Sequence, residues 1–221
     1  MLLKVILLSL TVYFAASKIA ISIEAGPDRP TTAECFQYDV ANGFGPYIME
    51  VWGSDGQDNQ YFDQDYKNAK ANGMDQVDTY ATICDRFTVD QIVSGVSDRL
   101  PSDFDGSVWI RIAAGFGTCF GNNTAGHRIE YFEDVVKELK NHGLKIGGIF
   151  TDNYSWNAVL ASEQIKSSDL LSSLPLWYQG LTNNPNFEDY RQIGGWTQPT
   201  MKNYLLGNYM CNIFTVSAYY K

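Results

Sequence analysis

Three acidic side chains lie near the ends of segments that are expected to form strands, and they are the first candidates for catalysis. Glu50 falls near the end of the second expected strand, Asp78 lies on the third, and Asp152 comes just after the fifth. Paired carboxyl groups serve as general acid and general base in hydrolysis, and the strand ends of a barrel meet at one mouth. A solvated or structurally hydrogen-bonded carboxylate produces the same pattern, so both interpretations stay open.

The segment from Ser107 to Gly115 is the strand on which acid/base chemistry is expected to sit. Its sequence, Ser-Val-Trp-Ile-Arg-Ile-Ala-Ala-Gly, alternates, so that Arg111 and Ala113 share one face. A hydrolase needs carboxylates at two such positions, and neither residue is one. Arg111 would also pair with a nearby acid and favour its charged form, which is the wrong form for a general acid.

Aromatic residues are the second group that bears on function. Flat rings can line a sugar-binding groove, but aromatic residues of a barrel also pack its core, and both interpretations stay open. The candidates for substrate binding are Tyr80, Trp177 and Tyr178, and the further aromatic residues considered are Trp52, Trp109 and Trp156.

Other catalytic signatures are missing from the sequence. His127 and His142 fall at the edges of an expected helix and are interpreted as surface or capping residues. No Ser/His/Asp set, phosphate-binding loop or metal-ligand cluster appears. We therefore expect no cofactor and no metal.

The elements that must position these residues alternate between short β-rich runs and amphipathic helical stretches, which is typical of an α/β protein. The expected strands cover 20–25, 47–52, 76–83, 107–113, 145–150, 175–178, 201–205 and 213–219. The expected helices run from Thr31 or Thr32 to 42, from Asp58 or Asn59 to 73, over 89–100 and over 129–141. The helical pattern fades after Leu174. Eight expected strands suggest a barrel.

The first 17 residues are predicted to be a secretory signal peptide. They contain one basic residue, Lys4, then an apolar run and small residues suited to cleavage near Ser17. The run is shorter than the roughly 20 residues of a membrane span, and Lys18 closes it. We therefore expect a secreted, extracellular protein in which residues 18–221 form one barrel domain.

The charge of the chain limits its partners. A formal net charge of -9 argues against nucleic acid and against anionic membranes, because both require a cationic surface. The length of the mature chain suits a single core, and a monomer is expected. Two glycosylation sequons, at Asn122 and Asn153, fit a secreted chain.

The cysteines are even in number and lack paired metal-ligand spacing, so disulfides are favoured over zinc. They are Cys35, Cys84, Cys119 and Cys211. Connectivity cannot be read from sequence alone. The pairing we expect is Cys84 with Cys119, which lie just beyond adjacent strands, and Cys35 with Cys211.

Several stretches resemble a known family. Pro30-Thr-Thr, Cys35-Phe-Gln and Asn42-Gly-Phe-Gly look like its first helix and helix exit, and Gly73-Met-Asp-Gln-Val-Asp-Thr-Tyr looks like its third strand. The most specific stretches are Leu144-Lys-Ile-Gly-Gly-Ile-Phe-Thr, Pro175-Leu-Trp-Tyr, Asn184-Pro-Asn-Phe and Gly194-Gly-Trp-Thr-Gln-Pro. On these motifs the chain is similar to the glycoside hydrolase family 25 lysozymes, in the branch found in nematodes and protists, from about Ile23 to Tyr220.

The resemblance implies an irregular TIM-like (β/α) barrel of about eight strands, with fewer helices than a full TIM barrel and a cleft at the carboxyl ends of its strands. It also implies cleavage of bacterial cell-wall glycan (peptidoglycan). It also implies four carboxylates that this chain lacks. The family's aspartate and glutamate on the fourth strand align with Arg111 and Ala113, its first-strand aspartate with Gly26, and its late aspartate with Val216. The fallback acids remain Asp78, Glu50 and Asp152, of which Asp78 is expected to face the cleft because the family also carries an aspartate there.

The resulting functional hypothesis is a secreted lysozyme-like protein of antibacterial innate defence or digestion that has lost muramidase activity, with peptidoglycan as its candidate ligand. Loss of a general acid alone removes a factor of roughly 10² to 10⁴ in rate. Two alternatives stay open: a glycosidase with relocated carboxylates, and a secreted interaction protein without catalysis.

Overall fold

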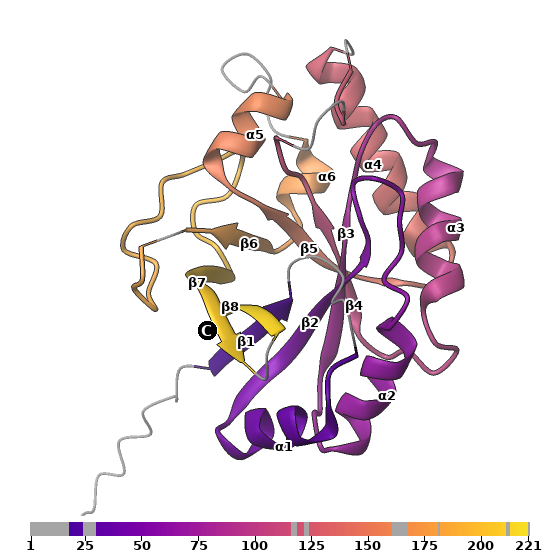
Figure 1. The fold of residues 1–221 in the computed structure, drawn as a ribbon. Helices are drawn as coiled ribbons and strands as arrows, with labels where there is room; N and C mark the ends of the chain where they lie inside the picture. The colour runs from indigo at the N-terminus through magenta and orange to yellow at the C-terminus, as the bar shows by residue number, and fades with distance from the viewer. Residues whose placement is uncertain are drawn as a thin grey trace, which may run out of the picture.

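The fold is a closed barrel of eight strands, as expected from the sequence (Figure 1). The computed structural model describes residues 18–23, 30–115, 119–121, 124–160, 168–180, 182–210 and 213–220. Neighbouring strands from β1 to β7 pair in parallel, and β8 closes the barrel by pairing antiparallel with both β7 and β1. The barrel is therefore mixed, and the carboxyl ends of seven strands meet at one mouth.

All eight predicted strands are present, with bounds that shift by a few residues. They are β1 (Lys18–Ile23), β2 (Phe44–Trp52), β3 (Val77–Thr82), β4 (Ser107–Arg111), β5 (Lys145–Thr151), β6 (Leu176–Gln179), β7 (Met201–Met210) and β8 (Ile213–Tyr220). The largest difference is in β7, which continues five residues beyond the predicted end at Leu205 because β8 pairs with it as far as Met210.

The four predicted helices are also present, and two further helices were not predicted. The helices are α1 (Ala33–Ala41), α2 (Phe62–Ala71), α3 (Val89–Arg99), α4 (Ala125–Asn141), α5 (Asn153–Leu160) and α6 (Asp169–Ser172). Helix α4 begins four residues before the predicted start, where the side chain of Thr124 accepts a hydrogen bond from the His127 amide. His142 is the residue that ends it, and both histidines are exposed, as expected.

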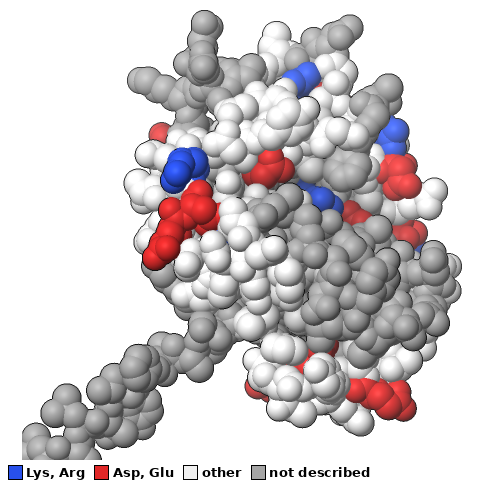
Figure 2. All heavy atoms as spheres, turned by 60° about the vertical axis from the view of Figure 1, so that its left-hand side comes forward, with Lys and Arg blue, Asp and Glu red and all other residues white. Residues whose placement is uncertain are grey.

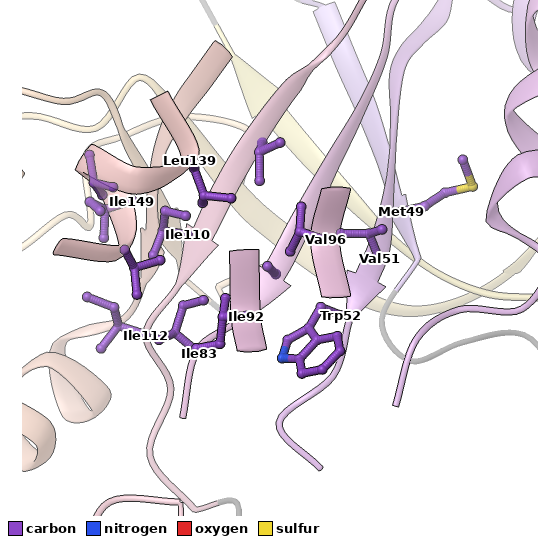
Figure 3. Packing of buried hydrophobic residues seen from close by; sticks show 14 of the residues in the cluster. Met49, Val51, Trp52, Ile83, Ile92, Val96, Ile110, Ile112, Leu139 and Ile149 are labelled. Atoms are coloured by element: carbon purple, nitrogen blue, oxygen red, sulfur yellow. The ribbon is translucent and has the colours of Figure 1, made fainter. Parts of the chain in front are cut away.

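Two hydrophobic layers lie on opposite sides of the barrel wall. The inner layer takes one side chain from each strand: Ala20, Ile48, Tyr80, Trp109, Phe150, Trp177, Met201 and Ala218. The outer layer fills the space between the strands and the helices, where Ile92 and Val96 of α3 and Leu139 of α4 meet outward residues such as Ile110 (Figure 3). Successive side chains of a strand point to opposite faces, so each strand contributes residues to both layers.

Helices cover only part of the barrel. Helices α1 and α3 pack on β2, and α4 packs on β5. Strands β7 and β8 lie left of centre in Figure 1, whereas α3 and α4 lie on its right. Figure 2 turns the left side toward the viewer, and acidic and basic side chains are interspersed on it. Between β6 and β8, the described residues form no helix. This agrees with the fading helical pattern after Leu174.

The outer layer gives a prediction at Gly95 of α3. A Cβ at this position would overlap the six-membered ring of Trp52, which lies under α3 beside Ile92 and Val96 (Figure 3). Alanine favours a helix over glycine, but overpacking a core costs about 1–3 kcal/mol. We therefore expect Gly95→Ala to lower the free energy of unfolding, measured by chemical denaturation, by about 1–2 kcal/mol.

Gly126 provides the matched control for this substitution. It lies in the first turn of α4, and no atom of the described residues is within 4 Å of a Cβ added there. Gly126→Ala should raise the free energy of unfolding by up to about 1 kcal/mol, through the lower entropy of the unfolded chain. Equal effects of the two substitutions would contradict the packing argument.

The predicted disulfide between Cys84 and Cys119 is confirmed. Cys35 is disulfide-bonded as well. Its expected partner, Cys211, lies outside the described residues, and so do residues 1–17, so that pairing and the signal peptide stay predictions. Among the described residues, no helix is both long and apolar enough to cross a membrane.

Candidate functional site at the carboxyl ends of the strands

Strand β4 places Arg111 at the mouth of the barrel. Side chains alternate along the strand, so Arg111 points to the same side as Trp109, which lies in the inner layer. In the strand register Arg111 lies beside Thr82 of β3 and Phe150 of β5. The guanidinium carbon of Arg111 lies 5.0 Å from the ring centre of Phe150 and 5.6 Å from that of Tyr80. These are cation–π distances, so the aromatic rings hold the charge in place. The side chain remains partly exposed.

Ala113 follows the end of β4 and is 8% exposed. It therefore leaves the second position of the strand apolar. Val216 on β8 is fully buried, and its carbonyl accepts a 3.4 Å hydrogen bond from the Ser22 hydroxyl of β1. Gly26 lies outside the described residues. At the three aligned positions that the structure describes, no carboxylate is present.

An aromatic layer lies beneath Arg111 inside the barrel. Phe150 and Trp177 stack with ring centres 3.9 Å apart, and the Tyr80 ring meets both edge-on at 5.7 and 6.0 Å. Tyr80 and Trp177 are 0% exposed. In this structure these two candidates for sugar contact form the interior packing below the mouth.

Tyr178 lies on the other side of the barrel wall. It packs edge-on against Tyr190 at 5.1 Å and is partly exposed. Burial, with smaller contributions from the charges of Asp189 and Asp152, raises the pKa of its hydroxyl. Of the three aromatic candidates, Tyr178 is therefore the one with a surface that a ligand can reach.

Asp78 lies at the opposite end of the barrel from Arg111. It is the second residue of β3 and is 3% exposed. Its carboxylate accepts hydrogen bonds from the Ser107 amide at 2.9 Å, the Gln76 amide group at 3.1 Å and the Trp109 indole at 3.2 Å. This position differs from the expected one, because the register puts Asp78 two inward layers below Thr82 and Arg111.

Asp152 is at the mouth and caps a helix. It follows β5, and its carboxylate accepts hydrogen bonds from the Ser155 amide and hydroxyl, both at 2.7 Å. The Ser155 oxygen in turn accepts a 3.1 Å bond from the Ala114 amide. Asp152 thereby starts α5 and ties it to the segment that follows Arg111, which is a structural role.

Glu50 is the fallback acid that is placed best for chemistry. It shares the inward face of β2 with Ile48, is partly exposed, and accepts a 2.6 Å hydrogen bond from the Thr82 hydroxyl. Thr82 pairs across the ladder with Arg111. Glu50, Thr82 and Arg111 therefore occupy adjoining strands at the mouth.

Sequence reasoning missed Asn203 of β7. This residue is fully buried, and its side-chain oxygen accepts a 2.7 Å hydrogen bond from the Trp177 indole. Its amide nitrogen has no hydrogen-bond partner among the described residues. The sequence indicated its inward position only through alternation: Asn203 is two residues after Met201 of the inner layer, so both lie on the same face of β7. Among the described residues, no group of three metal-ligating side chains occurs.

Of the two sequons, the structure describes the one at Asn153. Asn153 is the first residue of α5 and is partly exposed, and its side-chain oxygen accepts a 2.7 Å bond from Asn157. Ser155, the third residue of the sequon, is buried. Asn122 lies outside the described residues.

The chain is similar to lysozymes in sequence and in fold. The family model for lysozyme-like protein 1 matches residues 16–204. Counting factor 50 of Dictyostelium discoideum is 26% identical over 175 residues, which are 75% of this chain and 54% of that protein, so the chain spans about half of its length. Probable GH family 25 lysozyme 2 of the same organism is 26% identical over 202 residues, 87% of this chain and 88% of that protein.

Solved structures agree on the fold. A family GH25 lysozyme from Aspergillus fumigatus superposes with a TM-score of 0.72 at 14% identity, covering 93% of this chain and 94% of that one. At this identity the likeness concerns the fold alone. Together with the family match, it confirms the resemblance predicted from the sequence motifs: the chain belongs to the lysozyme-like protein family and has the barrel of the glycoside hydrolase family 25 lysozymes.

Proposed function

We propose that this protein is a secreted lysozyme-like barrel that has lost muramidase activity and retains binding of cell-wall glycan, in antibacterial defence or digestion. The observation that carries the proposal is the position of Arg111, a cation at the mouth where the family has an aspartate. Hydrolysis of a glycoside passes through an oxocarbenium-like state that a carboxylate stabilises.

A fixed cation at this place opposes that chemistry. If the guanidinium were about 4 Å from the developing positive charge, at an effective dielectric of about 20, the repulsion would be on the order of 4 kcal/mol, or roughly a thousandfold in rate. Ala113 cannot transfer a proton. The hydrogen bonds that Asp78 and Asp152 make within the fold also support the proposal, because they give both acids a structural role.

The decisive experiment combines lysis of bacterial cell walls with a pull-down on insoluble peptidoglycan. We expect the natural chain to bind peptidoglycan and to release no more soluble glycan than a buffer blank. The double variant Arg111→Asp, Ala113→Glu should gain measurable lysis, and Arg191→Asp, the same arginine-to-aspartate replacement at an exposed position, should gain none. Lysis by the natural chain at the rate of an ordinary lysozyme would overturn the proposal, and absence from the pull-down would remove its glycan-binding part.

A second candidate function is favoured by the position of Glu50. As a partly exposed acid at the mouth, it is the residue on which a glycosidase with relocated carboxylates would depend. If the natural chain shows any hydrolysis, Glu50→Gln should abolish it, whereas Asp63→Asn on the exposed face of α2 should leave it unchanged. Activity that survives Glu50→Gln would exclude this candidate.

A further inference from the structure

Helix α1 buries an aspartate without a partner among the described residues. Asp39 is 1% exposed, and neither of its carboxylate oxygens has a hydrogen-bond partner in the part of the chain that the structure describes. A charged carboxylate without a partner in an apolar site is far more costly than a neutral carboxyl group in the same place. Its state of protonation therefore has a direct effect on the stability of the fold.

A second buried aspartate lies on the neighbouring helix. Asp65 of α2 is 0% exposed and accepts hydrogen bonds from the Thr31 amide at 2.7 Å and the Thr31 hydroxyl at 3.0 Å. The Thr31 hydroxyl oxygen is also 3.1 Å from the Tyr47 hydroxyl of β2. Burial and the charges of both aspartates raise the pKa of Tyr47. Asp39, Asp65 and Tyr47 thus form an acidic cluster where α1 and α2 meet β2.

No described cation neutralises this cluster. The lysines of α2 are engaged elsewhere, Lys67 with Asp63 at 2.7 Å and Lys70 with Asp105 at 3.1 Å. The other acid of α1, Glu34, is exposed. The described titratable groups that α2 and β2 present to the cluster are therefore Asp65 and Tyr47, and neither one supplies a positive charge.

We propose that the contact of α1 with α2 and β2 is a proton-dependent latch, tight when Asp39 is protonated and weakened when Asp39 is ionised. The helix is a suitable element for such a device, because it carries the disulfide-bonded Cys35 and packs Phe36 edge-on against Tyr47 at 4.9 Å. The folded barrel is then better suited to mildly acidic than to neutral surroundings.

The sign of the effect follows from linkage. Burial raises the pKa of Asp39 from its ordinary value of 3.8 to about 6, and burial raises that of Asp65 to about 6 against the opposing hydrogen bonds from Thr31. Between pH 4 and 6 the folded chain holds more protons than the unfolded chain. The stabilisation of the fold by the protonated forms of Asp39 and Asp65 is complete below pH 4 and is lost as the pH rises through 6.

The test is chemical denaturation from pH 4 to 7.5 of the natural chain, Asp39→Asn and Glu34→Gln. A difference of about two pH units between the two pKa values corresponds to about a hundredfold in the unfolding equilibrium constant. At pH 7 we expect the unfolding equilibrium constant of Asp39→Asn to be up to a hundredfold smaller than that of the natural chain. This ratio should shrink toward pH 4. Glu34→Gln should keep the pH dependence of the natural chain. The same ratio at every pH for Asp39→Asn would overturn the latch.

A second measurement tests the latch even if Asp39→Asn fails to fold, because it uses the natural chain. Titration of the side-chain carboxyl carbons of the natural chain by NMR should show aspartate signals with midpoints near pH 6. If every aspartate signal instead titrates at or below pH 4, the latch is excluded.

Discussion

Asp189→Asn is expected to lower the free energy of unfolding by about 3 kcal/mol, because it leaves the charge of Lys202 buried without its counter-ion. The Lys202 side chain is 0% exposed on β7. Its ammonium group forms an ion pair with Asp189 and donates to the Thr182 hydroxyl at 3.0 Å and to the carbonyls of Asn184 and Asn186 at 3.2 and 2.9 Å. These contacts hold the loop after β6 against the barrel, where no described helix covers it.

The pH dependence of this pair has the opposite sign to that of Asp39. Burial would raise the pKa of Asp189, but hydrogen bonds from Lys202 and Thr182 hold it below its ordinary value. A depressed pKa stabilises the fold above the ordinary value of about 4, and this stabilisation is lost as the pH falls. The difference in free energy of unfolding between the natural chain and Asp189→Asn should therefore be largest at neutral pH.

The comparison needs two further variants. The double change Lys202→Met, Asp189→Asn should have a free energy of unfolding within about 1 kcal/mol of that of the natural chain. Replacing both partners of a buried ion pair often leaves the stability unchanged. Asp63→Asn, which breaks the exposed pair with Lys67, should cost less than about 0.5 kcal/mol. If Asp189→Asn costs no more than Asp63→Asn in urea denaturation, Lys202 is not buried as described.

The second large effect is expected at Trp177, in the inner layer of the barrel. Trp177→Ala removes the stack on Phe150 and the hydrogen bond to Asn203. It leaves a cavity among the rings of Tyr80, Trp109 and Phe150, which come from three strands. Large-to-small changes of this kind cost about 3–5 kcal/mol. Chemical denaturation at neutral pH should show a loss in this range, and a loss below about 1 kcal/mol would contradict the packing.

A matched pair of indole changes separates packing from hydrogen bonding. Trp177→Phe leaves the Asn203 oxygen unpaired, at a cost of about 1–3 kcal/mol beyond the loss of ring volume. Trp52→Phe removes an indole N–H that is buried without a partner in the described part of the chain, so this polar penalty is absent. We expect Trp177→Phe to be the more destabilising of the two, and the reverse order would exclude the role assigned to Asn203.

Most of the barrel could be predicted from local patterns. Alternation identifies β4 and the other strands because a strand exposes its two faces in turn, and helical spacing identifies the buried face of α4, including Phe132 and Leu139. Helix α5 was missed because its start depends on the Asp152 carboxylate and its bond to Ser155, whose oxygen also serves Ala114 after another strand. Such a cap is hard to recognise without the neighbouring strand.

The amino-acid sequence by itself determined the types of residue at the aligned catalytic positions, so the absence of carboxylates at Arg111 and Ala113 needed no structure. Only the tertiary structure decided the environment of each charged group. Asp39 and Lys202 look like ordinary surface residues in the sequence, yet both are buried. Asp39 has no hydrogen-bond partner among the residues that the structure describes, and Lys202 is paired with Asp189. The reason is physical: residue type and periodicity are local, whereas burial and charge pairing depend on segments that meet only when the barrel closes.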